Sequence, residues 1–373
     1  MRIAPFATEH YYALYEFNTP HMLSSSDCET MSINELMALA GLGLDGLGSL
    51  CLGYTESQGN PDLRTAVAAG YDQITPEQVV VLTSPVEGIY LVMRALLEPG
   101  DEAIVLTPAY DALKNMAEHV TGRVHTWPLT PVAGDWQMDL DELERLINDQ
   151  TKLIIVNFPH NPTGYLPALD EFQALIDLCA QRGMWLFCDE MYRGLEFGGM
   201  GMLPSAADLY ERAIILAGLS KTHGLPGLRA GWLLIRDEET RQALLNWKFY
   251  TTICPAAPTE FLALAALSAG EALVARNKAL IRDNIALVEP FFRRWPDLFT
   301  WRRPRAGSVA LVGLNVPSAI DYCHNLAQTA GVLLLPGAFM GIEDRYVRFG
   351  FGREKFANAL THYQTYLVEQ KVK

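Results

Sequence analysis

Four short segments of the chain are almost entirely apolar and alternate with stretches of helical periodicity. The apolar segments are residues 102–106, 153–156, 185–188 and 213–216, and the candidate helices are residues 88–97, 109–120, 140–148 and 169–182. Strands that are apolar on both faces belong to parallel sheets covered on both sides by helices. The sequence therefore predicts an α/β fold with a mostly parallel sheet.

The pattern changes after about residue 236. Residues 239–248 and 259–295 are rich in Ala and Leu and predict long helices, while residues 309–314 and 346–351 predict strands with a helix at 321–330 between them. These elements are typical of a smaller α+β domain. We expect an N-terminal arm (1–45) that packs with the small domain and the active site, a large domain (46–240) and a small C-terminal domain (241–373).

Composition narrows the possible partners. The net charge of -14 argues against binding to nucleic acid, because phosphate backbones are bound through an excess of Lys and Arg. No apolar run reaches the 18 or so residues that span a bilayer, and the first residues lack the apolar core of a signal peptide. The six cysteines show no metal-ligand or redox spacing. We expect a cytoplasmic protein with reduced thiols, no bound metal and no membrane contact.

Polar residues follow the predicted strands, at the sheet edge where ligands gather in α/β proteins. These segments are Asn-Phe-Pro-His-Asn-Pro-Thr-Gly at 157–164, Cys-Asp-Glu-Met-Tyr at 188–192 and Ser-Lys-Thr-His-Gly-Leu-Pro-Gly-Leu-Arg at 220–229. A fourth feature is Arg348, within an apolar strand. Each has an ordinary alternative: a turn, a helix cap, a surface lysine and an arginine at a sheet edge.

Taken together and in this order, the four features resemble the class I/II aminotransferase family of fold-type I enzymes, which use pyridoxal 5′-phosphate (PLP). The resemblance extends from about Tyr54 to Arg348 and includes Tyr-Thr-Glu-Ser-Gln-Gly at 54–59 and Leu-Glu-Pro-Gly-Asp at 97–101. It implies a PLP-binding large domain and a smaller α+β domain.

The resemblance also implies a role for each matching residue. Lys221 would hold PLP as an internal aldimine and later move the substrate's Cα proton as general base and acid. Asp189 would keep the pyridine nitrogen protonated, while Asn161 and Tyr192 would bind the phenolic oxygen. Tyr110 would stack on the ring.

The phosphate and the substrate have matching candidates as well. Ser84, Val86, Ser220 and Arg229 would bind the phosphate, together with Tyr54 from a neighbouring subunit, which implies a homodimer with shared active sites. Arg348, with Asn161 beside it, would bind the substrate's α-carboxylate through a two-pronged contact.

Two positions depart from the family pattern around the phosphate. Pro85 lacks an N–H where the family has a small residue, and Gly218 stands where a serine usually contacts the phosphate. A missing hydrogen bond to a charged group could weaken binding by roughly 1.5–3 kcal/mol. We therefore expect a phosphate site with fewer donors than usual.

The N-terminal arm also departs from the family pattern. Its Ser-Ser-Ser segment at 24–26 resembles that of capreomycidine synthase, a family member that acts on an arginine derivative by elimination and cyclisation. Asp27 and Glu29 would suit a cationic side chain, although Ser26 or Asp27 could instead cap a helix that begins near Met31.

Two histidines inside the cofactor motifs, His160 and His223, have two possible roles. Either could act as an additional acid or base, or could form only a hydrogen-bonded wall.

Three functions remain open. The first is an aminotransferase moving an amino group between an amino acid and a 2-oxo acid. The second is a PLP-dependent lyase, cyclase or oxidase acting on an amino acid, possibly a cationic, arginine-like one. The third is a non-catalytic sensor, but the acidic chain has no room for a DNA-binding module before Tyr54.

Overall fold

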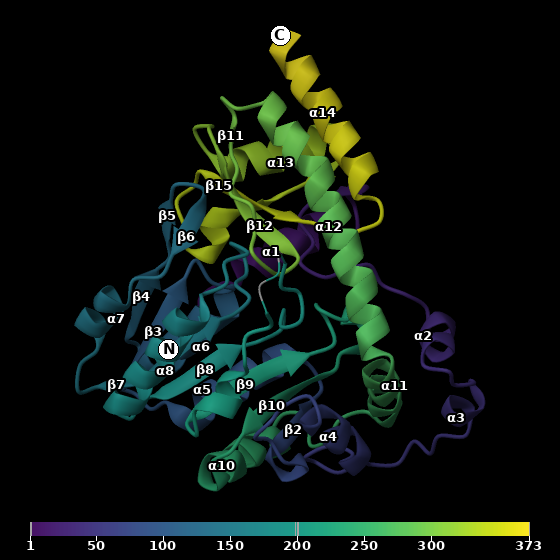
Figure 1. The fold of residues 1–373 in the computed structure, drawn as a ribbon, viewed down its shortest axis with the longest axis vertical. Coiled ribbons are helices and arrows are strands. Elements are labelled where there is room, and N and C mark those ends of the chain that lie inside the picture. The colour runs from purple at the N-terminus through teal and green to yellow at the C-terminus, as the bar shows by residue number, and fades with distance from the viewer. Residues whose placement is uncertain (1, 198, 200, 373) are drawn as a thin grey trace.

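The computed structural model describes residues 2–197, 199 and 201–372 of the chain, which form two layered parts joined by one long helix (Figure 1). The larger part contains a seven-stranded sheet in the order β2-β10-β9-β8-β7-β3-β4. Its strands are β2 (Val79–Leu82), β3 (Glu102–Thr107), β4 (Val124–Pro128), β7 (Thr151–Asn157), β8 (Trp185–Asp189), β9 (Ala213–Gly218) and β10 (Gly231–Ile235). Strand β10 runs antiparallel to both of its neighbours, β2 and β9, and the other neighbouring pairs of this sheet are parallel. The predicted α/β fold with a mostly parallel sheet is confirmed.

Alternate residues of the central strands enter two separate hydrophobic cores, one on each face of the sheet. Val105 and Ile155 pack on one face, and their neighbours Ile104 and Ile154 pack on the other. This is why the strands are apolar throughout. The first face is covered by α5 (Pro85–Leu96), α6 (Asp111–Thr121) and α10 (Glu238–Phe249), and the second by α4 (Pro61–Ala68), α7 (Leu140–Leu146), α8 (Leu169–Arg182), α9 (Ala206–Leu209) and α11 (Ala257–Ser268).

The smaller part, at the top of Figure 1, has its own four-stranded antiparallel sheet and its own core. The strand order is β11-β12-β15-β14, with β11 (Phe299–Thr300), β12 (Val309–Leu314), β14 (Leu335–Pro336) and β15 (Tyr346–Gly350). Three helices cover it: α12 (Gly270–Arg294), α13 (Ala319–Ala330) and α14 (Phe356–Val372). A hairpin of β5 (Thr130–Val132) and β6 (Asp135–Gln137) extends from the larger part.

The long helix α12 runs along one side of the molecule from α11 to the smaller part (Figure 1). Helix α10 packs on α5, and α11 packs on α4, so both lie with the large sheet although they follow residue 236. The expected boundary between a large domain (46–240) and a small domain (241–373) stays a prediction, and most of α10 and all of α11 lie on the C-terminal side of it. Within the described ranges no single helix has the length and apolarity to cross a membrane; α11 and α12 meet that criterion only as a pair bent by 73°.

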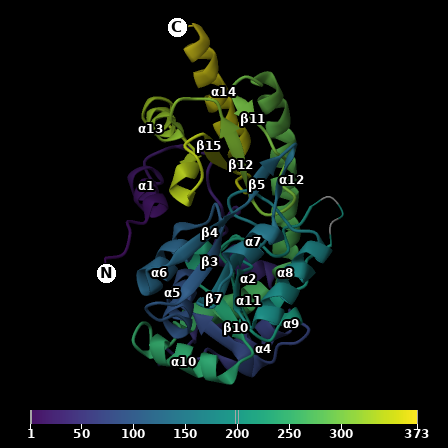
Figure 2. The same ribbon diagram turned by 90° about the vertical axis from the view of Figure 1, so that its left-hand side faces the viewer.

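The N-terminal arm lies against the smaller part, as Figure 2 shows for α1 (Ala7–Tyr15). Strand β1 (His21–Met22) pairs in parallel with β13 (Val332–Leu333). Two short helices follow, α2 (Ile33–Leu39) and α3 (Asp45–Gly48). Helix α2 begins after Ser32, which forms a capping box with Glu35, so the cap is not Ser26 or Asp27.

The two departures near the phosphate motif are neighbours in space. Pro85 is the first residue of α5, where a missing N–H breaks no helical hydrogen bond. Its ring fills the space beside two glycines: a Cβ on Gly218 would lie 3.2 Å from Pro85 Cγ, and one on Gly231 would lie 2.8 Å from the same atom. The proline thus occupies room that side chains on β9 and β10 would need. A serine at position 218 does not fit beside it.

We predict that Gly218→Ala destabilises the fold. The new Cβ would lie 2.8 Å from the carbonyl oxygen of Ala230 and 2.9 Å from Gly231 Cα, and both are backbone atoms that cannot move aside alone. Overpacking of this kind costs about 1–3 kcal/mol. Urea unfolding measures the loss, with Gly227→Ala as the matched control because a Cβ added there would have no atom within 4 Å. Equal unfolding midpoints for the two variants would contradict the packing argument.

Candidate active site

A cavity of about 880 Å³ opens where the carboxyl ends of the central strands meet the arm and the smaller part. The large sheet contributes residues from the loops after β3, β7, β8 and β9, the arm contributes α1 and residues 25–27, and the smaller part contributes Arg348 and Arg353. Of the residues expected from the sequence, this cavity brings together Val86, Tyr110, Asn161, Asp189, Tyr192, Ser220, Lys221, Arg229 and Arg348.

Lys221 follows β9 by three residues and extends into the cavity. Its Nζ donates a hydrogen bond to Ser26 Oγ at 2.8 Å. Burial lowers the pKa of the amine, and Arg348 lowers it further, while the carboxylates of Asp27, Glu9 and Asp189 oppose the shift. A lysine with a lowered pKa holds a larger fraction of the neutral, nucleophilic amine.

Asp189 ends β8 and is buried, and its Oδ1 accepts a hydrogen bond from the backbone N–H of Met191 at 3.0 Å. Burial raises the pKa of its carboxyl to about 6, while Lys221 and the hydrogen bond from Met191 lower it. Tyr192 is buried close by. Burial raises the pKa of its phenol, whereas Arg348 and the hydroxyl of Ser26 lower it.

Arg348 lies on β15 with its guanidinium almost fully buried. Its nitrogens donate to the carbonyl oxygen of Ser24 at 2.9 and 3.2 Å, to Tyr12 Oη at 2.7 Å and to Asn161 Oδ1 at 3.0 Å. All of these acceptors are neutral. A buried cation bound only to neutral acceptors keeps its attraction for an anion, because its charge is not compensated.

The other end of the cavity carries the groups expected at a phosphate. Arg229 donates to Ser84 Oγ at 2.9 Å and adopts a left-handed backbone conformation with φ 52°, which is rare for a residue with a side chain. Val86 lies in the first turn of α5, where free N–H groups favour anions. The Ser220 hydroxyl is buried without a hydrogen-bond partner among the described residues.

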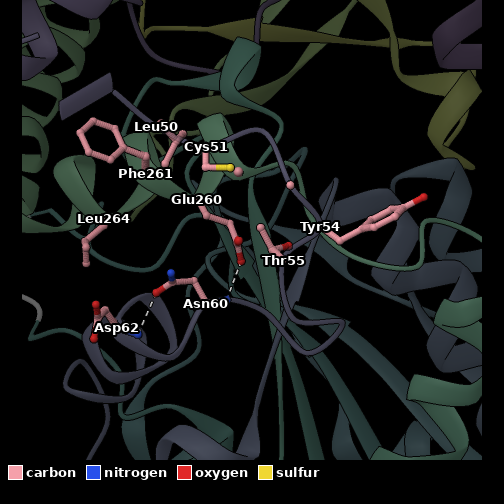
Figure 3. A pocket seen from close by; sticks show the side chains of 11 residues that line it. Leu50, Cys51, Tyr54, Thr55, Asn60, Asp62, Glu260, Phe261 and Leu264 are labelled. Carbon is pink, nitrogen blue, oxygen red and sulfur yellow. Dashed lines mark hydrogen bonds between the residues drawn. The ribbon is translucent and has the colours of Figure 1, made fainter. Parts of the chain in front are cut away.

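Tyr110 precedes α6 and lines the same cavity, and its hydroxyl donates to Glu9 of the arm at 3.0 Å. Tyr54 does not join the cavity. Its side chain is 90% exposed and lies at the edge of a second pocket, which it lines with Glu260 and Phe261 among others; its ring extends away from Phe261 (Figure 3).

Two acidic residues of the arm have a protein partner. Asp27 lines the cavity, and both of its carboxylate oxygens accept from Nη2 of Arg353, at 2.8 and 2.9 Å. Glu29 lies 3.7 Å from Nη1 of the same arginine and accepts from the backbone N–H of Glu354. Arg353 therefore compensates the charge of Asp27, and it leaves part of the negative charge of the pair uncompensated, since one guanidinium faces two carboxylates.

Two other carboxylates, which the sequence interpretation missed, lie at the mouth of the cavity. Glu9, Tyr12 and Glu16 line it from α1 and its C-terminal cap. Their spacing of three and four residues places them on one helix face, and this spacing was the signal available in the sequence. Burial, Asp27 and Glu9 raise the pKa of Glu16.

Burial favours the neutral form of both motif histidines. Burial lowers the pKa of His160 to about 3 and that of His223 to about 4. His160 is bound to Thr163 Oγ1 at 2.8 Å, and neither ring lines the cavity. Both rings lie outside the cavity lining, and the two roles suggested by the sequence stay predictions.

These residues fit PLP. The cofactor needs an amine for its aldehyde, an acid for its ring nitrogen and cationic or N–H donors for its phosphate. The cavity offers an amine with a lowered pKa at Lys221, a buried carboxylate at Asp189, and the guanidinium of Arg229 beside the unpaired hydroxyl of Ser220.

Comparison with known proteins agrees with this geometry. Residues 22–361 match the model of the family "Aminotransferase class I and II". Capreomycidine synthase from Streptomyces vinaceus is 33% identical over 333 residues, which cover 88% of this chain and 84% of that enzyme.

Two solved structures are similar over nearly the whole chain. A PLP-dependent aminotransferase from Streptococcus suis has a TM-score of 0.92 at 29% identity, covering 99% of each chain. The PLP-dependent cyclase OrfR has a TM-score of 0.92 at 26% identity, covering 99% of this chain and 98% of that one. The chain thus belongs to the class I and II aminotransferase family, whose enzymes depend on PLP.

Proposed function

We propose that the protein is a PLP-dependent aminotransferase, which moves an amino group between an amino acid and a 2-oxo acid. The observation that carries the proposal is the shared cavity of Lys221, Asp189 and Arg348. It combines a nucleophilic amine, an acid and a buried guanidinium that has no carboxylate partner among the described residues, and these are the groups that an α-amino acid and PLP require together.

In this proposal the site residues share the binding of the cofactor. Lys221 would bind PLP covalently, Asp189 would face the ring nitrogen, Asn161 and Tyr192 would bind the phenolic oxygen, and Tyr110 would stack on the ring. Arg229 and Ser220 bind the phosphate with Ser84 and Val86; Arg229 already donates to Ser84 at 2.9 Å, which supports a joint site.

PLP supplies an electron sink that stabilises the negative charge left at Cα when its proton leaves. Arg348 holds the substrate's carboxylate and so fixes the orientation of its Cα. Lys221 Nζ takes the proton from Cα as a base and returns it as an acid. The lowered pKa of this amine supports the first role, because an ammonium could not accept a proton.

We further propose a homodimer with shared active sites, in which Tyr54 reaches the phosphate of the partner subunit. Two exposed apolar segments, one at residues 52–54 and one at residues 249–253, support this proposal, because large apolar side chains seldom remain exposed together on a monomer. A hydrogen bond of 2.8 Å from Thr55 Oγ1 to the carbonyl oxygen of Pro255 connects the chain next to these two segments. Their most exposed side chains are Leu52, Tyr54, Phe249, Tyr250 and Ile253.

A second candidate is a PLP-dependent lyase, cyclase or oxidase acting on a cationic amino acid. The carboxylates of Glu9 and Glu16 favour it, because they line the mouth of the cavity while Arg353 compensates Asp27. The resemblance to capreomycidine synthase and to the cyclase OrfR supports the same candidate.

Borohydride reduction should fix the cofactor on the peptide that carries Lys221, because the amine with the lowered pKa in the cavity is the one that meets the aldehyde. Peptide mass spectrometry measures the label, and Lys221→Ala should abolish it. Lys248 is an internal control, since it is also buried and its pKa is also lowered, but it lies outside the cavity. A label on any other lysine would overturn the assignment.

An amino-acid screen distinguishes the two candidates. An aminotransferase without its 2-oxo acid should convert bound PLP stoichiometrically to pyridoxamine phosphate, which chromatography detects. Turnover of the amino acid with PLP unchanged would instead identify the second candidate. Lys221→Ala serves as the control and should show no conversion in either case.

Glu16→Gln should raise the KM for L-arginine more than the KM for L-leucine. The lost attraction for a cationic side chain at a partly exposed site corresponds to roughly a two- to five-fold change. Steady-state kinetics of the amino acids measures it, with Glu239→Gln as the control on the exposed surface of α10. An equal change for both amino acids would argue against a cationic substrate.

A further inference from the structure

The hydroxyl of Ser26 joins two residues of the candidate site. It accepts a hydrogen bond from Lys221 Nζ at 2.8 Å, and it lies near enough to Tyr192 to lower the pKa of that phenol. A serine hydroxyl has one donor and two acceptor sites, so it can face both groups at once. Ser26 therefore lies between the amine and the phenol.

The backbone around Ser26 is held tightly against the smaller part. Leu23 and Glu29 pair with Gly350 and Gly352 through backbone hydrogen bonds of 2.8 and 2.6 Å, and Ser308 Oγ donates to the carbonyl oxygen of Ser26. A Cβ on Gly350 would lie 1.7 Å from the carbonyl oxygen of Ser25. Close approach without a side chain is the reason for a glycine there.

The neighbouring residues fix the same segment from the side of the cavity. Arg348 and Tyr12 both donate to the carbonyl oxygen of Ser24, and Arg353 donates to Asp27. Ser26 thus lies between two anchored residues, so its hydroxyl is presented to Lys221 by a backbone with little freedom. A group held in this way costs little reorganisation when it acts.

We propose that Ser26 is a positioning residue that holds the free amine of Lys221 beside Tyr192 and orients it toward the substrate's Cα. This proposal rests on the proposed function of Lys221. When Nζ gains the proton that Cα loses, the electron pair stays with the substrate and its cofactor, and the new ammonium donates to Ser26 Oγ. The hydroxyl favours the charged form of the amine, because an ammonium donates a stronger hydrogen bond than a neutral amine does.

The charged groups around Lys221 define the expected sign of a pH effect. Asp27, Glu9 and Asp189 favour the ammonium, while burial and Arg348 disfavour it. Ser26→Ala removes an acceptor of the ammonium and leaves these groups in place. The pKa of Lys221 should then fall below its value in the parent protein.

The first test uses the cofactor-free full-length protein. Lys221 is methylated with formaldehyde and cyanoborohydride across a pH series, and mass spectrometry measures the labelled peptide. In Ser26→Ala the pH of half-maximal labelling should move down, whereas Ser26→Thr, which keeps a hydroxyl, should restore the parent profile. Ser25→Ala is the control, because it removes the adjacent hydroxyl, which Arg353 and not Lys221 contacts.

The second test uses the holoenzyme and L-arginine in D₂O, with NMR following exchange of the α-proton. Loss of a hydrogen bond to a charged group should slow exchange roughly ten- to hundred-fold in Ser26→Ala, with threonine restoring most of the rate. Labelling profiles that coincide for Ser26→Ala and Ser25→Ala, or a threonine variant that behaves like alanine, overturn the proposal. Borohydride labelling of Lys221 would still stand in that case, so failure of this proposal is distinguishable from failure of the proposed function.

Discussion

The guanidinium of Arg348 connects the three parts of the molecule. It extends from β15 of the smaller part, donates to Tyr12 and Ser24 of the arm, and donates to Asn161 in the loop after β7 of the large sheet. A buried cation must have its hydrogen bonds satisfied, because an unpaired charge in a protein interior costs several kcal/mol. The position of the arm, and with it the wall of the cavity, follows from this requirement.

The arm in turn brings Ser26 to Lys221. The backbone of residues 23–29 follows the end of β15, and Ser25, Ser26 and Asp27 of this segment line the cavity. The contact of Lys221 thus depends on packing elsewhere in the molecule. Gly350 and Gly352 leave space for the backbone of the arm, and the arm brings the Ser26 hydroxyl within hydrogen-bond distance of the amine. The site is therefore built from all three parts.

Much of this fold could be predicted from the sequence because burial on both faces leaves a clear pattern. The apolar segments are β3, β7, β8 and β9, and helix α8 has the predicted bounds. Strands β2, β4 and β10 were missed: β2 was overlooked although it is as apolar and as buried as the strands that were found, β4 is a partly exposed edge strand, and β10 follows a glycine-rich turn. An apolar run also carries no information about strand direction, which β10 reverses.

The site was predictable where its residues follow the strands, since the carboxyl ends of parallel strands meet at one edge. The arm was not, because its contacts join residues far apart in the chain, such as Lys221 and Ser26, separated by 195 positions. The charge balance was hidden for the same reason: only the folded chain pairs Asp27 with Arg353. The proposed roles of the individual residues stay predictions.

One consequence follows from the left-handed backbone of Arg229. This residue shapes the turn before β10 and also carries the cation at the Ser84 end of the cavity. Glycine would relax the backbone but remove the charge, and lysine would keep a charge but lose the planar fork and leave the unfavourable φ in place. A substitution at this position therefore changes the turn geometry and the anion-binding charge together, so neither property can be improved there without regard to the other.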